Sequence, residues 1–590
     1  MNKKIRMPGR WLSFLLFFMF ISWSLTAIPE DYDVIIKSTT IIDGTGRAPF
    51  QGDIAIRGNK IAIVGHVKGH APVVIDGSGF TTCPGFIDPH NHADLSIMKY
   101  PLCENLVMQG ITAFLGGNCG DSPAPQKNKK FGEWLLEVEK AGISINYAPL
   151  VGHNTMRRLV MGDDYRRRAT AEEIEKMKEL VAEAMENGAF GFSVGLDPGP
   201  GHFADTEEIA AIAKEVKKAG GLFDPHTRGT QSQWATDDPK EVNYGIFYGP
   251  VEDAFVGIYK GYAEAIEVAR KTGVRLNIAH LDNAYMVPQP HPDSLEVAGA
   301  HATLEYLIES ARKEGLDVSF DVIAFDANIS GKEWMYWGLF SKSPALNWVY
   351  QIVRKSKKDY IAQLQTKEFR DKVRSAYDAG RLKLGMIHTK AWPYWMNYFK
   401  IIRCKNKEYE GKTIAEIAKL RNTDALEAIF DIIVEDPDTI WIQHIDPRLH
   451  SEVIPVLIKD PYAMPCTDTR ALPPELGDDF DVSPTAYGLY PHYIRRYVKE
   501  RSILSLEEAV RKATSLPAQV IGLKDRGILK AGNFADILIF DYESIKERGD
   551  YMNPDQRPEG IEFVLVNGQI IYKDRTHTGK KPGKVIRHSQ

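Results

Sequence analysis

The chain has 590 residues and a net charge of −5, with 44% hydrophobic and 26% charged residues. This composition is typical of a packed globular protein, and the length predicts several domains or one large α/β barrel with additions. Without a basic excess, nothing favours nucleic acid or an anionic membrane surface as a partner. Five cysteines are too few and too odd a number for a disulfide framework, which leaves room for a thiol with a chemical role.

Residues 1–27 have the pattern of a targeting segment. An apolar run over residues 11–27 follows four basic side chains, those of Lys3, Lys4, Arg6 and Arg10. A basic start before a short apolar stretch is typical of a secretory signal. An uncleaved membrane anchor is the alternative, because the run reaches the lower limit of roughly 17 residues for a spanning helix. We therefore expect a periplasmic or secreted protein that contacts a membrane only through this segment, if it is retained.

Short β-branched runs at both ends of the chain predict one shared β domain. The dipeptides Gly58-Asn59 and Asn567-Gly568 each separate two such runs and predict tight hairpin turns. Since chain termini often lie close together, residues 28–82 and 526–590 are expected to form one small β-sandwich. Two separate β appendages are the alternative.

The middle of the chain, residues 83–525, alternates strand-like and helical patterns, which predicts a parallel sheet closed into an eight-stranded barrel. Nine strand-like runs begin near residues 85, 111, 146, 189, 221, 275, 317, 439 and 463. One of the runs at 317–322 and 439–443 is therefore expected to belong to an insertion. Helical patterns cover residues 171–187, 206–219, 261–272, 303–314 and 413–435, with Thr170 and Thr206 as expected helix starts. No glycine-rich nucleotide fingerprint follows any strand, which argues against a dinucleotide-binding fold.

Potential metal ligands recur where the predicted strands end, which is where a barrel carries its chemistry. They are His90, His92, Cys119, His226, His280 and Asp468. Imidazole, thiolate and carboxylate groups together suit Zn²⁺. Each of these residues alone has a structural explanation, and the other four cysteines are assigned to apolar packing. Asp88 is either a structural acid or the hydrogen-bond partner of a ligand histidine.

The motifs around these residues resemble those of one enzyme family. The segment 84–92 (PGFIDPHNH) resembles the first-strand signature of the amidohydrolase superfamily. The segments 117–125 (GNCGDSPAP), 188–196 (GAFGFSVGL), 226–228 (HTR) and 514–518 (TSLPA) are similar to motifs of its D-aminoacylase branch, the N-acyl-D-amino-acid deacylases. The resemblance implies a metal-dependent (β/α)₈ barrel with a β-sandwich built from both termini.

The resemblance also implies roles for individual residues. Cys119, His226 and His280 match the ligands of a tightly bound zinc ion. His90, His92 and Asp468 match a second, weaker position, with Cys119 able to bridge the two. Many relatives bridge two metals with a carboxylated lysine at the end of the fourth strand, but residues 189–196 contain no lysine. This departure favours the cysteine-bridged branch.

The same comparison suggests hydrolysis of a linear amide by metal-activated water. Asp468 is expected to accept the proton of the water and to deliver it to the leaving nitrogen. His153 is a candidate hydrogen-bond donor to the developing oxyanion, and a structural hydrogen bond is the equal alternative. The partner is expected to be a small N-acyl compound. Hydrolysis of a cyclic amide or a lactone, and a non-catalytic binding protein on this fold, are the alternative functions.

The substrate-binding positions depart from the family pattern. Asp282, Thr485 and Phe325 stand where typical members carry the Lys, Arg and Tyr that hold the substrate carboxylate. An aspartate there repels an anion, so either the substrate lacks a carboxylate at this point or other groups bind it. Arg228 and Arg470 are the candidate replacements, and selection of a cationic group by Asp282 is a third possibility.

Two insertions are expected in the barrel, near residues 231–262 and 325–400. The second is rich in tryptophan, with Trp334, Trp337, Trp348, Trp392 and Trp395. Such a segment is expected to be the core of a subdomain or, alternatively, a wall over an apolar acyl group or a sugar.

Overall fold

The computed structural model describes residues 31–588 except for 166, 197–199, 229–253, 282–291, 293, 327–332, 342, 344–345, 385–386, 390–392, 444–451, 477–481 and 551–552. The expected targeting segment, Asp282, Trp392 and most of the first expected insertion lie outside the described residues. Within the described part of the chain, no helix is both long enough and apolar enough to span a bilayer.

Eight parallel strand positions form the central barrel, in the order expected from the sequence. Two hydrogen-bonded sheets supply them, β6-β7-β8 and β9-β10-β11-β12-β13-β19. Only Leu150 separates β8 from β9, so these two short strands occupy one position. The strands are β6 (Phe86–Asp88), β7 (Ile111–Gly116), β8 (Asn146–Pro149), β9 (Val151–Gly152), β10 (Gly191–Gly195), β11 (Leu222–His226), β12 (Arg275–Ile278), β13 (Val318–Val322) and β19 (Ala463–Pro465). The predicted α/β barrel is confirmed.

Asp88 joins the first and last strands of the barrel. Its buried carboxylate accepts hydrogen bonds from both the main-chain N–H (3.2 Å) and the hydroxyl of Thr467, just after β19. One residue further on, the N–H of Asp468 donates to the carbonyl of His90 at 3.1 Å. Asp88 is therefore a structural acid, and the closure that it makes brings two expected metal ligands side by side.

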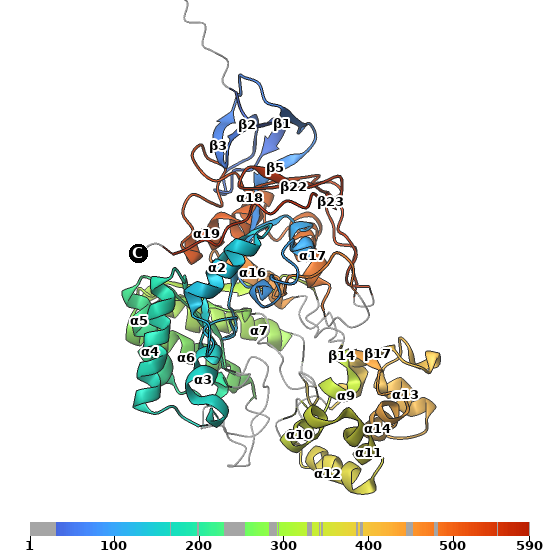
Figure 1. Cartoon of the computed structure of the whole chain (residues 1–590). Coiled ribbons are helices and arrows are strands. Elements are labelled where there is room, and N and C mark those ends of the chain that lie inside the picture. Colours follow the sequence, from blue (N-terminus) through green and yellow to red (C-terminus); the bar gives the residue numbers. More distant parts are fainter. Residues whose placement is uncertain are drawn as a thin grey trace, which may run out of the picture.

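Helices cover the outside of the barrel (Figure 1). They are α1 (Glu104–Val107), α2 (Phe131–Ala141), α3 (His153–Met161), α4 (Ala171–Glu186), α5 (Thr206–Lys218), α6 (Ala254–Thr272), α7 (Ser294–Ala302), η6 (Thr303–Ile308), α8 (Glu309–Lys313), α16 (Val453–Ile458), α17 (Thr485–Tyr493), η10 (Ile494–Glu500), α18 (Leu506–Ala513) and α19 (Ser515–Ile521). Thr170 caps α4 as expected, because its hydroxyl accepts from the N–H of Glu173. Thr206 does not cap α5, since the preceding Asp205 accepts the corresponding bond.

Of the two strand-like runs that were candidates for an insertion, the run at 439–443 is inserted, and the run at 317–322 is a barrel strand. β18 (Ile440–Gln443) pairs antiparallel with β14 (Glu333–Trp334) and β17 (Phe399–Arg403) in a separate sheet. The insertion also holds α9 (Met335–Gly338), α10 (Asn347–Lys355), α11 (Lys357–Leu364), α12 (Lys367–Asp378), β15 (Lys383–Leu384), β16 (Ile387–His388), α13 (Ile414–Leu420) and α14 (Ala425–Glu435). The helical pattern over 413–435 is thus two helices, because Asp424 caps a new helix.

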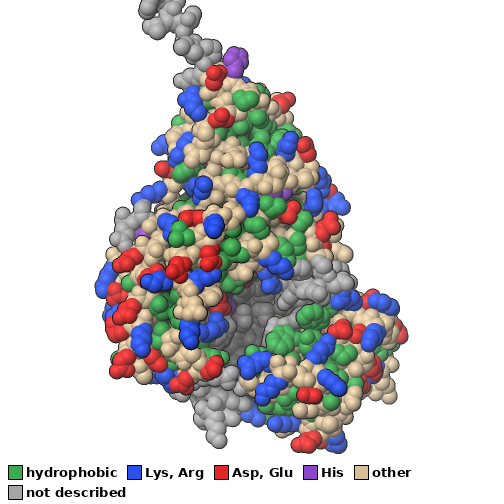
Figure 2. Space-filling model, viewed as in Figure 1, with side chains coloured by type: hydrophobic (Ala, Val, Ile, Leu, Met, Phe, Trp, Pro, Cys, Tyr) green, Lys and Arg blue, Asp and Glu red, His purple; other side chains and the backbone are tan. Residues whose placement is uncertain are grey.

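The aromatic residues of this insertion form the core of a subdomain. Trp395 and Trp441 are each 1% exposed, and both pack in one apolar cluster that extends from Met335 to Trp441. The subdomain therefore continues well past residue 400. It lies beside the barrel, and the surface between them is hollowed (Figures 1 and 2). The chain enters it from the carboxyl end of β13, the end of the barrel that carries the expected ligands.

The two ends of the chain share one sheet, and the expected pairing is confirmed. β20 (Ile537–Phe540) pairs antiparallel with β5 (Thr81–Pro84). The other strands are β1 (Val34–Ile41), β2 (Phe50–Arg57), β3 (Lys60–Gly65), β4 (Val73–Asp76), β21 (Ile561–Val566), β22 (Gln569–Lys573) and β23 (Thr576–His577). Both hairpins are as predicted, and Asn567 and Gly568 have the positive φ angles of 48° and 78° that a tight turn of this kind requires.

A buried polar network fastens this sheet to the barrel. Arg526 donates to the carboxylate of Asp536 and, at 2.9 Å, to the side-chain oxygen of Asn567. Asn146, in barrel strand β8, donates to the same carboxylate at 3.1 Å. Loss of Asp536 would leave the arginine charge buried without its partner.

We predict that Asp536→Ala destabilises the protein by about 3–5 kcal/mol, the usual cost of breaking a buried ion pair. Thermal unfolding monitored by circular dichroism measures the effect. Asp574→Asn is the control, because this carboxylate is 84% exposed in the turn between β22 and β23, and asparagine tolerates its positive φ of 50° as aspartate does. The control should change stability by less than about 0.5 kcal/mol. Equal melting temperatures for the two variants would contradict the role of the network.

Candidate metal centre

The structure brings all six expected ligands together at the carboxyl ends of the barrel strands. His90 and His92 follow β6, Cys119 follows β7, His226 ends β11, His280 follows β12 and Asp468 follows β19. Among these six residues, three overlapping sets have ligand atoms within 4.8 Å of one another: His90, His92 and Cys119; Cys119, His226 and His280; and His90, His280 and Asp468. A fourth set joins His90 with Asp224 and Asp321.

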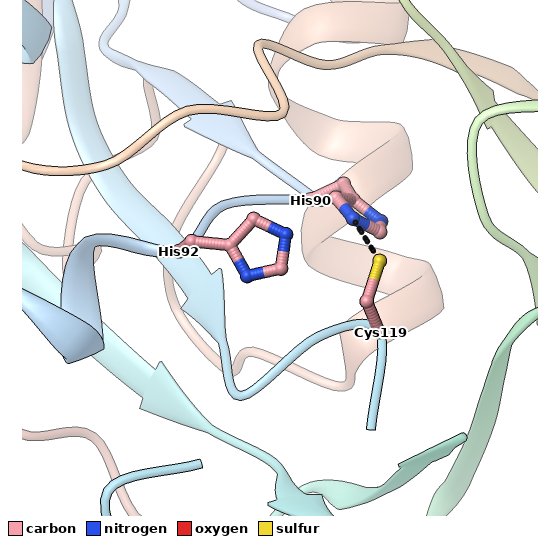
Figure 3. A group of neighbouring side chains, drawn as sticks. All are labelled: His90, His92 and Cys119. Atoms are coloured by element: carbon pink, nitrogen blue, oxygen red, sulfur yellow. Dashed lines mark hydrogen bonds between the residues drawn. The ribbon is translucent and has the colours of Figure 1, made fainter. Parts of the chain in front are cut away.

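The thiol of Cys119 lies at the middle of the cluster. Its Sγ is 3.3 Å from His90 Nε2, 3.4 Å from His226 Nδ1 and 3.4 Å from His280 Nε2. Figure 3 shows Cys119 with the rings of His90 and His92 from the first-strand motif. Tetrahedral zinc, with bonds of about 2.3 Å to sulfur and 2.0–2.1 Å to nitrogen, places such ligand atoms roughly 3.5 Å apart. The donor set and its spacing therefore fit zinc.

Asp468 and His92 are the accessible members of the cluster. The Nε2 of His92 is 3.2 Å from Asp468 Oδ1, and their side chains are 22% and 26% exposed, whereas that of His90 is fully buried. Burial acts to raise the pKa of Asp468, but the hydrogen bond from His92 and the neighbouring imidazoles hold it well below its usual range. The group is thus an ionised carboxylate on the solvent side of the centre.

The protonation states favour metal binding. Burial lowers the pKa of His280 to about 3 and that of His90 well below its usual value, so both imidazoles stay neutral. Burial and the nearby carboxylates, first that of Asp468, raise the pKa of the Cys119 thiol well above its usual value. A thiolate at this position therefore needs a bound cation, which is the condition that a zinc ion meets.

Three of the ligands have strained backbones. Cys119, His280 and Asp468 have φ angles of 51°, 33° and 48°, in the left-handed region that residues other than glycine rarely adopt. Such conformations persist only where the surrounding structure holds them, and they concentrate at functional sites. The N–H groups of His280 and Asp468 are held by the carboxylate of Asp321 (2.7 Å) and the carbonyl of His90 (3.1 Å).

A layer of buried polar side chains that was not predicted from the sequence lies below the ligands. It consists of Asp224 in β11, Asn277 in β12 and Asp321 in β13, each at most 1% exposed. Burial raises the pKa of Asp321 to about 7 and that of Asp224 well above its usual range. The signal was present, because Asp224 lies two residues before His226 and so points to the same side of its strand.

His153 occupies a structural hydrogen bond. Its Nε2 is 2.8 Å from Glu208 Oε1, and Arg157 donates to both oxygens of the same carboxylate. All three side chains are buried. Of the two roles considered for His153, the geometry therefore supports the structural one, and the oxyanion role stays a prediction without a contact behind it.

Arg228 is committed to the fold, whereas Arg470 is exposed. The guanidinium of Arg228 contacts Glu264 at 3.0 Å and donates to the carbonyls of His202 and Ala204, both at 2.8 Å. With 2% exposure it is not available to bind a substrate carboxylate. Arg470 lies on the surface two residues after Asp468. Of the two candidate replacements, Arg228 is thus excluded by its contacts, and Arg470 is the exposed one.

Phe325 and Thr485, two of the positions that depart from the family pattern, carry neither a cation nor a phenol. Phe325 is 7% exposed and stacks on His492 with ring centroids 4.1 Å apart. Thr485 is the first residue of α17 and is 5% exposed. Asp282 lies outside the described residues.

The amidohydrolase family profile matches residues 73–327 and 386–572 of this chain, more than half of its length. The unmatched stretch between these ranges lies mostly in the aromatic subdomain. The resemblance drawn from the sequence motifs is thereby confirmed.

Two relatives match nearly the whole chain. N-acyl-D-glutamate deacylase of Alcaligenes xylosoxydans xylosoxydans is 27% identical over 586 residues, which cover 95% of this chain and 97% of the relative. D-aminoacylase of the same organism is 26% identical, over 94% of this chain and 98% of the relative.

Solved structures agree with these matches. A crystal structure of D-aminoacylase has a TM-score of 0.69 at 25% identity, covering 94% of this chain and 100% of its own. The N-acyl-D-glutamate deacylase from Bordetella bronchiseptica, complexed with zinc and a phosphonate inhibitor, has a TM-score of 0.67 at 24% identity, covering 95% and 100%. The second likeness supports the fold.

We predict that Cys119→Ala is purified without zinc, because the variant loses the thiol that contacts three imidazoles of the cluster. Elemental analysis after dialysis against buffer with trace zinc measures the metal content. Cys404→Ala is the control, since this buried cysteine lies in the subdomain core, and it should keep the zinc content of the unmodified protein. A Cys119→Ala protein with full zinc content would show that the centre is assigned to the wrong residues.

Proposed function

Because the chain belongs to the amidohydrolase family, we propose that it hydrolyses the linear amide bond of a small N-acyl compound with zinc as its cofactor. The observation that carries this proposal is the meeting of one thiol, four imidazoles and one ionised carboxylate at the carboxyl end of the barrel. The two deacylases that match almost the whole chain support a linear amide as the substrate.

The residues divide into a buried metal position and an accessible catalytic side. Cys119, His226 and His280 would hold the tightly bound zinc, and His90, His92 and Asp468 a second, weaker position that shares Cys119. When bound, zinc lowers the pKa of water to about 7 and polarises a carbonyl oxygen. His226 and His280 are buried, which keeps competing solvent away from these two ligands.

Asp468 is suited to move the proton. Its carboxylate is ionised and partly exposed, so it accepts a proton from the attacking water and then delivers it to the leaving nitrogen. The two transfers happen in sequence, which is why one carboxylate suffices. His92 Nε2 lies 3.2 Å from Asp468 Oδ1, on the same accessible side of the centre. The products are a carboxylate and a free amine.

The amine side of the substrate is proposed to lack a free carboxylate beside the scissile nitrogen. Thr485 and Phe325 supply neither a cation nor a phenol, and Arg228 is paired with Glu264. Of the two arginines suggested to bind a substrate carboxylate, Arg470 remains a candidate. The subdomain, which is inserted at the same end of the barrel, is proposed to shape specificity.

We expect Asp468→Asn to lower kcat at least about 10³-fold on every substrate that the unmodified enzyme cleaves, since proton transfer contributes 10²–10⁴-fold and the same side chain positions the site. Amine release from N-acetyl-D-amino acids, their primary amides and simple N-acyl amines is the assay, with zinc content measured in parallel. Zinc at the tight position should remain. Full activity of Asp468→Asn would exclude its proposed role.

The same panel tests the substrate class. The primary amides and the N-acyl amines should be hydrolysed at least as fast as the N-acetyl-D-amino acids. Arg470→Ala should not change the KM for the primary amides or the N-acyl amines. Preferential cleavage of the free acids would contradict the missing carboxylate, and a raised KM for the acids in Arg470→Ala would identify the group that binds them. Cleavage of hydantoins alone would instead favour the cyclic-amide alternative, and zinc binding without any turnover would favour a binding protein.

We also propose that the protein is exported, and the support is the basic and then apolar pattern of residues 1–27. Fractionation of cells that express the full chain should place it outside the cytoplasm, and replacing the four basic residues with serine should reduce export. A fully cytoplasmic protein would contradict this proposal.

A further inference from the structure

Below the metal ligands, one asparagine joins two buried aspartates across three adjacent strands. The Nδ2 of Asn277 in β12 donates to Asp224 Oδ2 at 2.8 Å and to Asp321 Oδ2 at 2.7 Å. Its side-chain oxygen lies 3.1 Å from the hydroxyl of Ser319, which fixes the orientation of the amide. The carboxylate of Asp321 is thus held in place from one side.

The other oxygen of Asp321 faces two metal ligands at once. Asp321 Oδ1 accepts the main-chain N–H of His280 at 2.7 Å and lies 3.6 Å from His90 Nδ1. The first contact holds a residue whose φ of 33° is unfavourable for a side chain with a Cβ. The second contact is to His90 Nδ1, a buried ring nitrogen that makes no hydrogen bond within the described residues.

Metal binding by His90 requires an acceptor at this point. The Nε2 of His90 faces Cys119 at 3.3 Å and Asp468 at 3.5 Å, so it is the nitrogen that a metal ion would use. A neutral imidazole that gives its Nε2 lone pair to a metal carries its proton on Nδ1. That proton is buried, and Asp321 Oδ1 is the carboxylate oxygen that it faces. Partners of this kind orient ligand histidines and raise their basicity.

We propose that Asp321 is the positioning residue for both halves of the metal centre, setting the tautomer of His90 and the strained backbone of His280. The inference rests on the proposed zinc centre but not on any particular substrate. It also explains why a carboxylate is buried in the barrel beside neutral imidazoles, where the desolvation cost needs a compensating interaction. Asn277 holds Asp321, and Asp321 holds the two ligands.

Asp224 provides a matched comparison in the same layer. It is buried like Asp321, shares the amide of Asn277, and its pKa is likewise raised by burial. Within the described residues, however, its hydrogen bond goes to Asn277 and none goes to a ligand residue. If buried charge alone strengthened zinc binding, removal of either aspartate would have a similar effect. If positioning matters, the two variants differ.

The test compares Asp321→Asn with Asp224→Asn in the full-length protein. Zinc affinity is measured by competition with a chromophoric chelator, and the geometry of the centre by the visible absorption spectrum of the Co²⁺-substituted protein. We expect Asp321→Asn to bind zinc about 10–100-fold more weakly, as is usual for loss of such a partner. Its Co²⁺ bands should shift, while Asp224→Asn should weaken binding several-fold less and keep the spectrum of the unmodified protein.

Asn277→Ala is the second variant and decides the matter if Asp321→Asn does not fold. It keeps both carboxylates but frees Asp321, so it should shift the Co²⁺ bands and lower zinc affinity, whereas a charge effect predicts no change. Equal affinities and unshifted spectra in the Asp321 and Asp224 variants, or an unshifted spectrum in Asn277→Ala, would overturn the inference. Neither readout needs turnover, so an inactive but zinc-binding protein would contradict the proposed function and leave this inference standing.

Discussion

The structure of the site depends on one thiol, that of Cys119, at the centre of a cluster of imidazoles. Cys119 Sγ meets three imidazole nitrogens at 3.3–3.4 Å, and burial opposes its ionisation. The cluster is thus complete only when a cation compensates the thiolate. The strained backbones of Cys119, His280 and Asp468 are consistent with this requirement, because three strand ends must turn inward to reach one point. The site is held by the barrel rather than by flexible loops.

Two further sets of hydrogen bonds hold the strand ends that carry the proposed metal ligands. Asp88 closes the ring between the first and last strands and sets Asp468 beside the first-strand histidines. Asp224, Asn277 and Asp321 then tie three adjacent strands together directly below the ligands. At a greater distance, the sheet built from both chain ends is fastened to β8 through Asp536. The contacts of Asp88 and Asp536 join residues more than 370 positions apart, whereas those of Asn277 join neighbouring strands 44 and 53 positions apart.

The chemistry and the specificity are carried by different parts of the molecule. The proposed ligands belong to the barrel, whereas the aromatic subdomain has its own core around Trp395 and Trp441, and its first half, up to residue 385, lies outside the family match. Its tryptophans mostly fill that core, so it contributes through its position at the carboxyl end of β13. Thr485 carries no charge and Arg228 is paired with Glu264, so neither supplies a free cation beside the metal centre.

Local patterns determined most of the architecture and predicted the six residues that the structure brings together at the carboxyl ends of the strands. Alternating apolar runs predicted eight barrel strands and one inserted strand, the turn dipeptides predicted both hairpins, and ligand-type residues at strand ends predicted the cluster. These features depend on residues near one another in the chain, or on the rule that parallel strands end at one face. Only the tertiary structure decided what long, polar side chains contact. It turned His153 toward Glu208, paired Arg228 with Glu264 and placed Asp321 between His90 and His280. Such pairings join distant strands across a desolvated interior, and nothing in the spacing of one segment specifies which partner a buried charge will find.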